Sequence, residues 1–256
     1  MHDAGHRAIF VSPGTNDLFG TLVTSFLGVS YDWWRPKHNE HHANPNQEDE
    51  DPDFAIPFLS FTKERFRQQK GFAKLLSKYQ MYLYFPIGTL VVFTIRKNSL
   101  EYLVKQRLFL SIVFLLVGVF AWFLLPFFLF PLSKAIVFLI VQNVITGLYL
   151  FNIFAPNHKG MPYIAKGVKI SFFEHQVMTA RNIYGHWLTD FIYMGLNYQI
   201  EHHLFPNCPR NKLHKITPYL LEICRKVKLE YTQVSVLESN KIILRELKQI
   251  AATAKS

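Results

Sequence analysis

The chain has 256 residues, of which 50% are hydrophobic and 16% aromatic, but its mean hydropathy is only +0.09. Its apolar residues are therefore concentrated in segments, which indicates a membrane protein with large water-facing parts and argues against a soluble globule. The formal net charge of +10 favours an anionic membrane surface over nucleic acid as the partner, and two cysteines without a CxxC motif exclude a disulfide framework.

The N-terminal segment contains the first of three histidine clusters. The first ten residues are too polar for a signal peptide, and they include the motif HDAGH, in which His2 and His6 stand four positions apart. On a helix this spacing places two imidazoles on one face, about 5–6 Å apart, where they can converge on a metal ion. One HxxxH pair alone is weak support for a metal site, because two ordinary surface histidines give the same pattern.

An apolar segment and the second histidine cluster come next. Residues 18–31 are apolar but too short to cross a bilayer, so they predict an interfacial or re-entrant helix. The motif HNEHH then contributes His38, His41 and His42. Adjacent histidines diverge by about 100° on a helix, so His41 and His42 suit two neighbouring ions better than one. The acidic run at residues 48–53 predicts a solvated loop, although a carboxylate there could orient a ligating imidazole.

A basic segment leads into a second borderline apolar stretch. Residues 63–78 contain six Lys or Arg against one Glu. Residues 79–95 are only 17 long and contain Pro86 and Gly88, so we expect an interfacial helix rather than a crossing. The histidine clusters must lie on one side of the membrane to meet, and this requires an even number of crossings between them.

Two long uncharged segments supply those crossings. Residues 108–132 and 135–156 carry no charge, and each is long enough as a helix to cross a hydrocarbon core of about 30 Å. They predict a transmembrane hairpin with Gln142 and Asn143 in helix–helix hydrogen bonds; a buried hairpin of a soluble protein is the alternative. Basic residues on both flanks place these flanks on the cytoplasmic side.

The third cluster lies in the remaining part of the chain. The motif QIEHH contains His202 and His203, with Gln199 where a leading histidine could stand. His175, His186 and His214 lack ligand spacing to another histidine, which favours structural or surface roles. The tail predicts a short strand-like piece and then a peripheral basic helix over 240–252.

Three clusters beside a transmembrane hairpin together predict a dinuclear metal site. Imidazole suits Zn, Cu, Fe and Ni, but seven clustered histidines exceed the four ligands of a structural zinc site. A membrane metal transporter is an alternative from another class. It would need ionisable residues within the spans, and the two spans contain none.

The motifs HDAGH, HNEHHANPN with DPD, and NYQIEHHLFP resemble the three histidine boxes of membrane fatty acid desaturases. The resemblance extends from His2 to about Pro209, and Gln199 at the start of the third box resembles the front-end subgroup. It implies a non-haem di-iron centre that uses O2 and two electrons to desaturate an acyl chain. The NHKG motif after the last span resembles a further ligand position. The ligands implied are His2, His6, His38, His41, His42, His158, His202 and His203, with Gln199, Glu40 and Glu201 around them.

The resemblance also implies a fold and partners. We expect an all-α integral membrane protein with one desaturase domain over 1–256, in which a cytoplasmic helical cap over 157–256 holds the metal site and the first two family helices are absent. The substrate would be an acyl-CoA or acyl-lipid chain. Aromatic residues such as Phe151, Phe154 and Tyr198 would line the apolar tunnel that holds it. No HPGG haem motif is found, so a separate cytochrome b5 or ferredoxin type donor is expected. A related di-iron lipid hydroxylase and an inactive truncated fragment are the alternatives.

Overall fold

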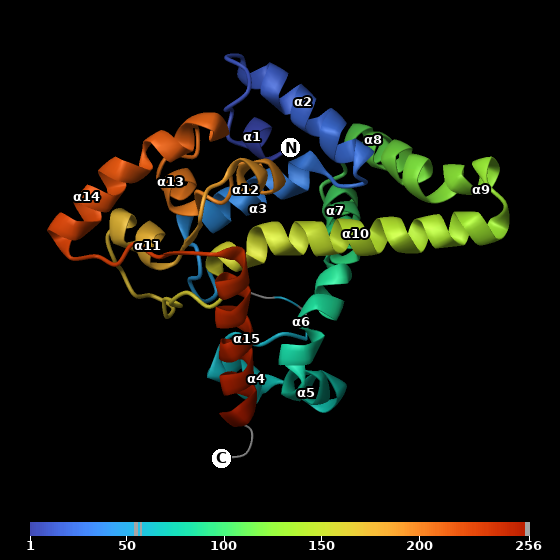
Figure 1. Ribbon diagram of the computed structural model, residues 1–256. Helices are drawn as coiled ribbons and strands as arrows, with labels where there is room; N and C mark the ends of the chain where they lie inside the picture. The colour runs from blue at the N-terminus through green and yellow to red at the C-terminus, as the bar shows by residue number, and fades with distance from the viewer. Residues whose placement is uncertain (54–55, 57, 254–256) are drawn as a thin grey trace. The chain divides into compact units, whose positions relative to one another are not determined.

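The computed structural model describes residues 1–53, 56 and 58–253, and these form helices with one short pair of strands (Figure 1). The chain divides into two compact units. The first comprises Met1–Asn39 and Thr89–Phe151, and the second comprises Glu40–Gly88 and Asn152–Ser256. Three helices, α3, α6 and α10, begin in one unit and end in the other.

The first unit contains the two uncharged segments together with the helices before them. The chain order is α1 (His2–Gly5), α2 (Pro13–Phe26), α3 (Tyr31–Ala43), α7 (Val91–Lys105), α8 (Phe109–Val119), a π-helical turn (Phe120–Leu124), α9 (Leu125–Leu129) and α10 (Leu132–His158). Helix α2 begins where Ser12 accepts a hydrogen bond from the backbone N–H of Thr15 and Pro13 occupies the first helical position.

Two helices among the described residues match the predicted spans in length and apolar character. Two helices are long and apolar enough to cross a membrane, Phe109–Leu129 and Leu132–His158, with mean hydropathies of 2.7 and 1.9. The π-helical turn lies just before Pro126. Proline has no N–H to donate to the carbonyl four residues earlier, and its ring would clash with that carbonyl, so the helix widens locally. In the second span, Asn143 Oδ1 accepts a 2.6 Å hydrogen bond from Arg96 of α7, as expected for a polar group within a span.

Close backbone contacts hold α8 to α2. A Cβ added at Gly118 would lie 1.5 Å from the carbonyl oxygen of Ser25, so α8 can pack on α2 at this distance only with glycine. Gly147 of α10 approaches the carbonyl of Thr89 in the same manner, at 2.2 Å. Small residues that let helix backbones touch are the usual packing device of membrane helices.

The second unit contains the remaining helices and both strands. In chain order these are α4 (Lys63–Gln68), α5 (Gly71–Lys78), α6 (Gln80–Thr89), α11 (Phe172–Met178), β1 (Asn182–Ile183), α12 (Trp187–Ile192), α13 (Gln199–Leu204), a 3-10 turn (Arg210–Lys215), α14 (Thr217–Val227), β2 (Gln233–Val234) and α15 (Val236–Ala252). A small core of buried residues joins α11, α13 and α14: Val177, Ala180, Ile200, Leu220 and Cys224.

The expectation of an all-α fold is corrected by a parallel pair of two-residue strands, β1 and β2. The predicted strand-like piece of the tail is β2. Its backbone groups form hydrogen bonds with β1, because a strand needs a neighbouring strand as its partner. The tail helix is longer than predicted, from Val236, because Ser235 caps it. It also buries Ile243 and Leu247 completely, so it belongs to the core of its unit rather than its periphery.

Neither borderline apolar stretch forms a spanning helix in the described structure. Residues 18–31 form the end of α2 and a turn at Gly28, whose φ of +70° favours glycine. Residues 79–95 are divided at Leu90 between α6 and α7. Their position relative to a membrane stays a prediction.

Candidate metal centre

The first unit brings His2, His6 and His38 together. Their ligand nitrogens lie within 4.8 Å of one another, and His6 Nε2 is 2.9 Å from His38 Nε2. Two ring nitrogens at this distance need a shared proton or a shared cation between them, because two lone pairs repel each other. Burial, followed by the charge of His2, lowers the pKa of His6 to about 3, which keeps its imidazole neutral and able to bind a metal.

A tryptophan supports this group. The Trp34 ring stacks on the His38 imidazole, with 4.4 Å between ring centroids and 20° between planes. Gly5, inside HDAGH, contacts the same indole, and a Cβ there would lie 2.6 Å from a ring carbon. The glycine of the motif therefore lets α1 approach Trp34.

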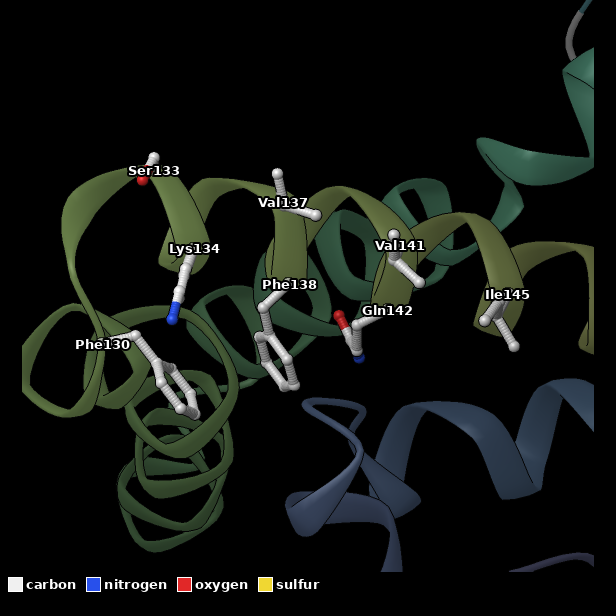
Figure 2. A pocket seen from close by; sticks show the side chains of 8 residues that line it. All are labelled: Phe130, Ser133, Lys134, Val137, Phe138, Val141, Gln142 and Ile145. Atoms are coloured by element: carbon white, nitrogen blue, oxygen red, sulfur yellow. The ribbon is translucent and has the colours of Figure 1, made fainter.

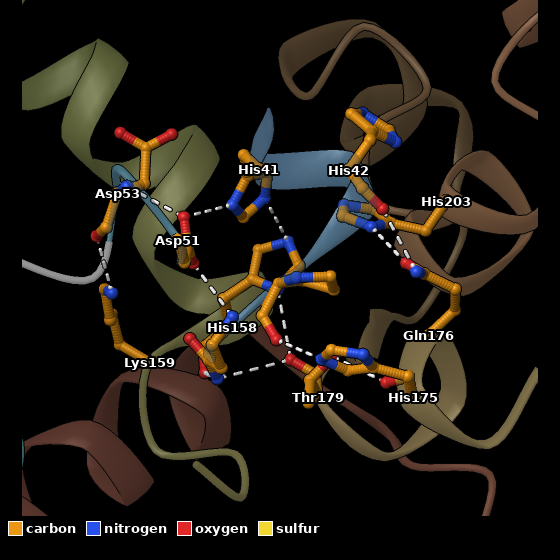
Figure 3. Close-up of polar contacts among 12 residues, drawn as sticks. His41, His42, Asp51, Asp53, His158, Lys159, His175, Gln176, Thr179 and His203 are labelled. Carbon is orange, nitrogen blue, oxygen red and sulfur yellow. Dashed lines mark hydrogen bonds and ion pairs between the residues drawn. The ribbon is translucent and has the colours of Figure 1, made fainter. Parts of the chain in front are cut away.

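The second unit contains His41, His158 and His203 as a buried group. Their ligand nitrogens also lie within 4.8 Å of one another, and Nε2 of His41 is 3.3 Å from Nε2 of His158 (Figure 3). Burial is the largest cause that lowers the pKa of His203 well below the usual value, and the neighbouring imidazoles lower it further. Three chain segments thus bring their imidazoles to one point.

An oxygen acceptor lies at the other nitrogen of each of these rings. Nδ1 of His41 is 2.9 Å from Asp51 Oδ1, Nδ1 of His158 is 3.0 Å from the Thr179 carbonyl, and Nδ1 of His203 is 2.8 Å from Gln176 Oε1. Each acceptor favours a proton on Nδ1, and in a neutral imidazole this leaves the lone pair on Nε2. Metal-ligating histidines are oriented in this way by their surroundings.

One buried nitrogen shows directly that the group fits a metal. Nε2 of His203 is buried, and no hydrogen-bond partner for it exists among the described residues. Leaving a buried polar atom unsatisfied costs roughly 1–3 kcal/mol, so a native structure keeps such an atom for a reason. A cation among the three Nε2 atoms would satisfy His203 and remove the repulsion between His41 and His158.

His42 and His202 form a further pair in the second unit. Their Nε2 atoms are 3.1 Å apart, and the His42 ring stacks on His203 with 4.1 Å between centroids. The Gln176 amide donates to the His42 carbonyl at 3.1 Å and accepts from His203, so one side chain orients two clusters. His41 and His42 diverge, with ring planes at 83°, as expected for adjacent helical residues.

Gln199 lies against this group through its amide. Its Nε2 is 3.0 Å from Nε2 of His158, while its Oε1 accepts a 3.1 Å hydrogen bond from Asn157. Asn157 also donates to the carbonyl of Leu196 at 2.9 Å, which fixes its own orientation. This orientation presents the amide nitrogen of Gln199, and not its oxygen, to His158.

The three acidic residues considered as orienting groups have different surroundings. Asp51 contacts His41, and both of its oxygens also accept backbone N–H groups, from Asn46 and Asp53. Burial alone would raise the pKa of Asp51, but His41 and Lys159 hold it below its usual range. Glu201 is fully buried and accepts hydrogen bonds from Asn182, Thr217 and Tyr231, whereas Glu40 is exposed.

Some residues that contact the histidines have no sequence motif that would have predicted the contact. Gln176 lies in α11 and contacts His203, and the carbonyl of Thr179, just after this helix, contacts His158, but neither residue has a motif spacing to its histidine. His175 is buried, and its Nε2 donates to the Pro45 carbonyl at 2.8 Å, which is the structural role expected for it. His186 and His214 are exposed, as expected for residues outside a site.

A buried arginine, Arg181, fixes the C-terminal end of α10, which carries His158. Arg181 is completely buried, and its guanidinium donates to the carbonyls of Pro156 and Lys159. Burial lowers the pKa of Arg181 to about 10, so it remains charged at neutral pH. A positive charge at the C-terminus of α10 also complements the helix dipole.

An apolar groove on the first unit contains no histidine. It measures about 660 Å³, and Figure 2 shows Phe130 and Lys134 at one end and Ile145 at the other. Its remaining lining is formed by Ser133, Val137, Phe138, Val141 and Gln142. An apolar groove on one face of a spanning helix is typical of a lipid-facing surface, so the histidines remain the candidate site.

The fold and these clusters define a class: a helical, histidine-rich protein with two helices that could span a membrane and a buried group suited to a metal ion. The family model for fatty acid desaturases matches residues 1–235. The chain belongs to the fatty acid desaturase family.

Relatives with curated descriptions agree with this assignment. The chain is similar to an acyl-lipid (9-3)-desaturase of Physcomitrium patens, with 31% identity over 99% of this chain and 50% of the relative. It is 30% identical to a Delta(6)-fatty-acid desaturase of Caenorhabditis elegans, over 98% of this chain and 60% of the relative. A Delta 8-(E)-sphingolipid desaturase of Emericella nidulans is 29% identical, over 98% and 50%. The chain therefore spans about half the length of the relatives it matches.

Proposed function

We propose that the chain is an O2-dependent fatty acyl desaturase that introduces a double bond through a non-haem di-iron centre. The observation that carries the proposal is the convergence of the Nε2 atoms of His41, His158 and His203 in the second unit, with the His203 atom buried and unsatisfied among the described residues. The proposed iron ligands are His2, His6, His38, His41, His42, His158, His202 and His203.

One helix links the two histidine groups in this proposal. Helix α3 carries His38 in the first unit and His41 three positions later in the second. Side chains three apart lie on one face of a helix, about 5–6 Å from each other. This spacing supports two neighbouring ions, one near His2, His6 and His38 and the other near His41, His158 and His203.

Bound iron would supply the oxidising power that no side chain has, because an unactivated C–H bond cannot be broken by an acid or base at neutral pH. The overall change is a saturated carbon pair plus O2, two protons and two electrons giving an alkene and two waters. The protein holds neutral imidazoles in one tautomer, through Asp51, Thr179 and Gln176. Burial of the histidines keeps water from competing.

The substrate proposed is an acyl chain on coenzyme A or on a membrane lipid. Relatives named for acyl-lipid, fatty-acid and sphingolipid substrates support this class without choosing within it. Phe151, Phe154 and Tyr198 are proposed to line the path of the chain. Electrons would come from a separate cytochrome b5 or ferredoxin type donor.

The proposed position is an integral membrane protein with its histidines on the cytoplasmic face. Two helices long enough to span support the membrane part. The basic residues on both flanks of the hairpin support the orientation, since they favour the cytoplasmic side.

The test combines metal analysis with lipid profiling. The full chain, purified from a membrane fraction, is expected to contain close to two irons, and cells that express it should gain a new double bond in their acyl or sphingoid lipids. His203→Ala should lose iron and product together. His214→Ala, which changes an exposed histidine outside the clusters, is the matched control.

Three results would separate the alternatives. A hydroxyl group in place of a double bond would indicate the related hydroxylase. Iron without any product would indicate an inactive chain that retains the site. Absence of iron from a folded protein would contradict the proposal itself.

A further inference from the structure

Large apolar side chains form an exposed stripe along α5 and α6. Phe72, Leu75, Tyr79 and Tyr82 are 69%, 50%, 56% and 72% exposed. Phe72 and Leu75 lie three positions apart on α5, Tyr79 follows the end of that helix, and Tyr82 lies three positions further along on α6. The segment made of α5, Tyr79 and α6 is called the α5–α6 arm below, and these four residues are its outer stripe.

The inner side of the same arm contains buried polar residues beside the buried ring of Tyr84. Ser77 and Gln80 are completely buried, and the Gln80 amide accepts from the backbone N–H of Ser60 and donates to the carbonyl of Leu247, both at 2.9 Å. The Ser77 hydroxyl donates to the carbonyl of Ala73 at 2.9 Å. A helix in water buries its apolar face and exposes its polar face. The arm reverses this arrangement at Ser77 and Gln80, which are buried, and at the exposed residues of the outer stripe.

The neighbouring helix α15 shows that this inversion is local. Helix α15 packs against α4 and α5 in the same unit (Figure 1). It buries Ile243 and Leu247 and exposes Lys241, Arg245 and Lys248, which is the ordinary water-facing pattern. The same packed group of helices therefore presents one polar and one apolar outer surface.

Positive charge surrounds the outer stripe. Four exposed basic residues lie on α4, on α5 or just before α5, against one exposed acid, Glu64. They are Lys63, Arg67, Lys70 and Lys78. Tyrosines with polar tips beside apolar rings, flanked by lysines, are typical of segments at the boundary between headgroups and acyl chains.

From this geometry we infer that the α5–α6 arm lies in a bilayer interface, with its outer stripe among acyl chains and its basic residues on the phosphates of anionic phospholipids. The charge complementarity commits the surface to a lipid membrane rather than to a protein partner. The inference does not depend on metal chemistry, so a chain without desaturase activity can still give the expected result.

Nitroxide labels on the full chain in lipid nanodiscs test the inference. Single cysteines replace Phe72 and Tyr82 in a Cys208→Ser background, where Cys224 is 1% exposed and shielded from reagent. Gln68→Cys and Lys248→Cys are the matched exposed controls in the same unit. Collision with oxygen, which dissolves in lipid, should exceed collision with a water-soluble nickel chelate several-fold at 72 and 82, and the order should reverse at 68 and 248.

Lipid composition tests the charged part. Adding phosphatidylglycerol to phosphatidylcholine nanodiscs should move the labels deeper, and Lys70→Gln combined with Lys78→Gln should abolish that change. Nickel access at 72 and 82 equal to the controls would place the outer stripe in water and overturn the inference. Protection from both reagents would show a protein partner or a second copy on the surface and would also overturn it. No response to phosphatidylglycerol would overturn the assignment of anionic lipid.

Discussion

Asp51 lies 2.9 Å from Nδ1 of His41, on the far side of the imidazole from the nitrogen that faces His158. The carboxylate is itself held by the backbone N–H groups of Asn46 and Asp53, each at 2.8 Å. The loop after the second histidine cluster is thereby fixed as the orienting partner of a candidate ligand. The arrangement gives a direct prediction about metal affinity.

Asp51→Asn should weaken metal binding while the protein still folds. The amide has only one acceptor oxygen, so it cannot hold His41 Nδ1–H and both backbone donors, and the imidazole is no longer fixed. Loss of such an orienting partner typically costs 10–100-fold in metal affinity. Competition of the purified protein with a chelator measures the change. Asp49→Asn, at an exposed ion pair with Lys166, should bind iron as the parent chain does, and equal affinity of both variants would contradict the argument.

Glu201→Gln should destabilise the fold and disturb the third histidine cluster. Glu201 is completely buried and accepts from Asn182 at 2.7 Å, Thr217 at 2.7 Å and Tyr231 at 2.5 Å. An amide nitrogen would meet at least one of these donors, at a cost of roughly 1–3 kcal/mol.

Thermal unfolding and iron content of the Glu201→Gln chain check this expectation. On heating, the variant should lose the iron proposed to bind at His202 and His203 before the helical signal of its circular dichroism spectrum decreases. Glu222→Gln, at an exposed pair with Lys226, serves as the control and should leave both measurements unchanged. Equal melting temperatures for the two variants would contradict the proposed anchoring role.

Gly118→Ala should destabilise the first unit. The added Cβ would lie 1.5 Å from the Ser25 carbonyl oxygen, so α8 must move away from α2 or the backbone must deform. Overpacking of this kind typically costs about 1–3 kcal/mol, or more where backbone is the obstacle. Thermal unfolding in detergent gives the magnitude. Val117→Ala, at a 61% exposed neighbouring position, should change the melting temperature little, and a similarly small change for Gly118→Ala would refute the close contact.

Glu246 should make the stability of the second unit fall with rising pH. Burial raises its pKa to about 7 from 4.5, against the opposing effects of Lys159 and Arg181, and Oε2 has no hydrogen-bond partner among the described residues. Because the folded state binds the proton more tightly than the unfolded state, the contribution to stability is complete below pH 4.5 and is lost as pH rises through about 7. The loss amounts to roughly 1–3 kcal/mol.

Glu246→Gln should remove this pH dependence. Melting temperatures from about pH 5 to about pH 8 should decline less for the variant than for the parent chain, with the variant more stable at the upper end. Glu238→Gln, which changes an exposed partner of Arg245, should follow the parent curve. A parent curve that rises with pH relative to Glu246→Gln would show that the carboxylate is stabilised in the folded state instead.

Local signals in the sequence were enough for the spans and for the histidine candidates. Two runs without charge predicted the hairpin, because length and hydropathy alone decide whether a helix can cross a bilayer. The helical spacing of His38, His41 and His42 predicted that they share one helix, and α3 has this form. The strands were not anticipated beyond one strand-like piece, since β1 and β2 exist only as each other's partner.

The sequence by itself identified the candidate metal-binding histidines and the candidate spans, because imidazoles at helical spacing and uncharged segments are properties of neighbouring positions. Only the tertiary structure decided which groups orient those imidazoles. Proximity in the chain favoured Glu40 and Glu201, but Asp51, Thr179 and Gln176 lie at the ring nitrogens of His41, His158 and His203. A hydrogen bond between residues far apart in the chain depends on where loops bring their atoms, and no periodicity records that.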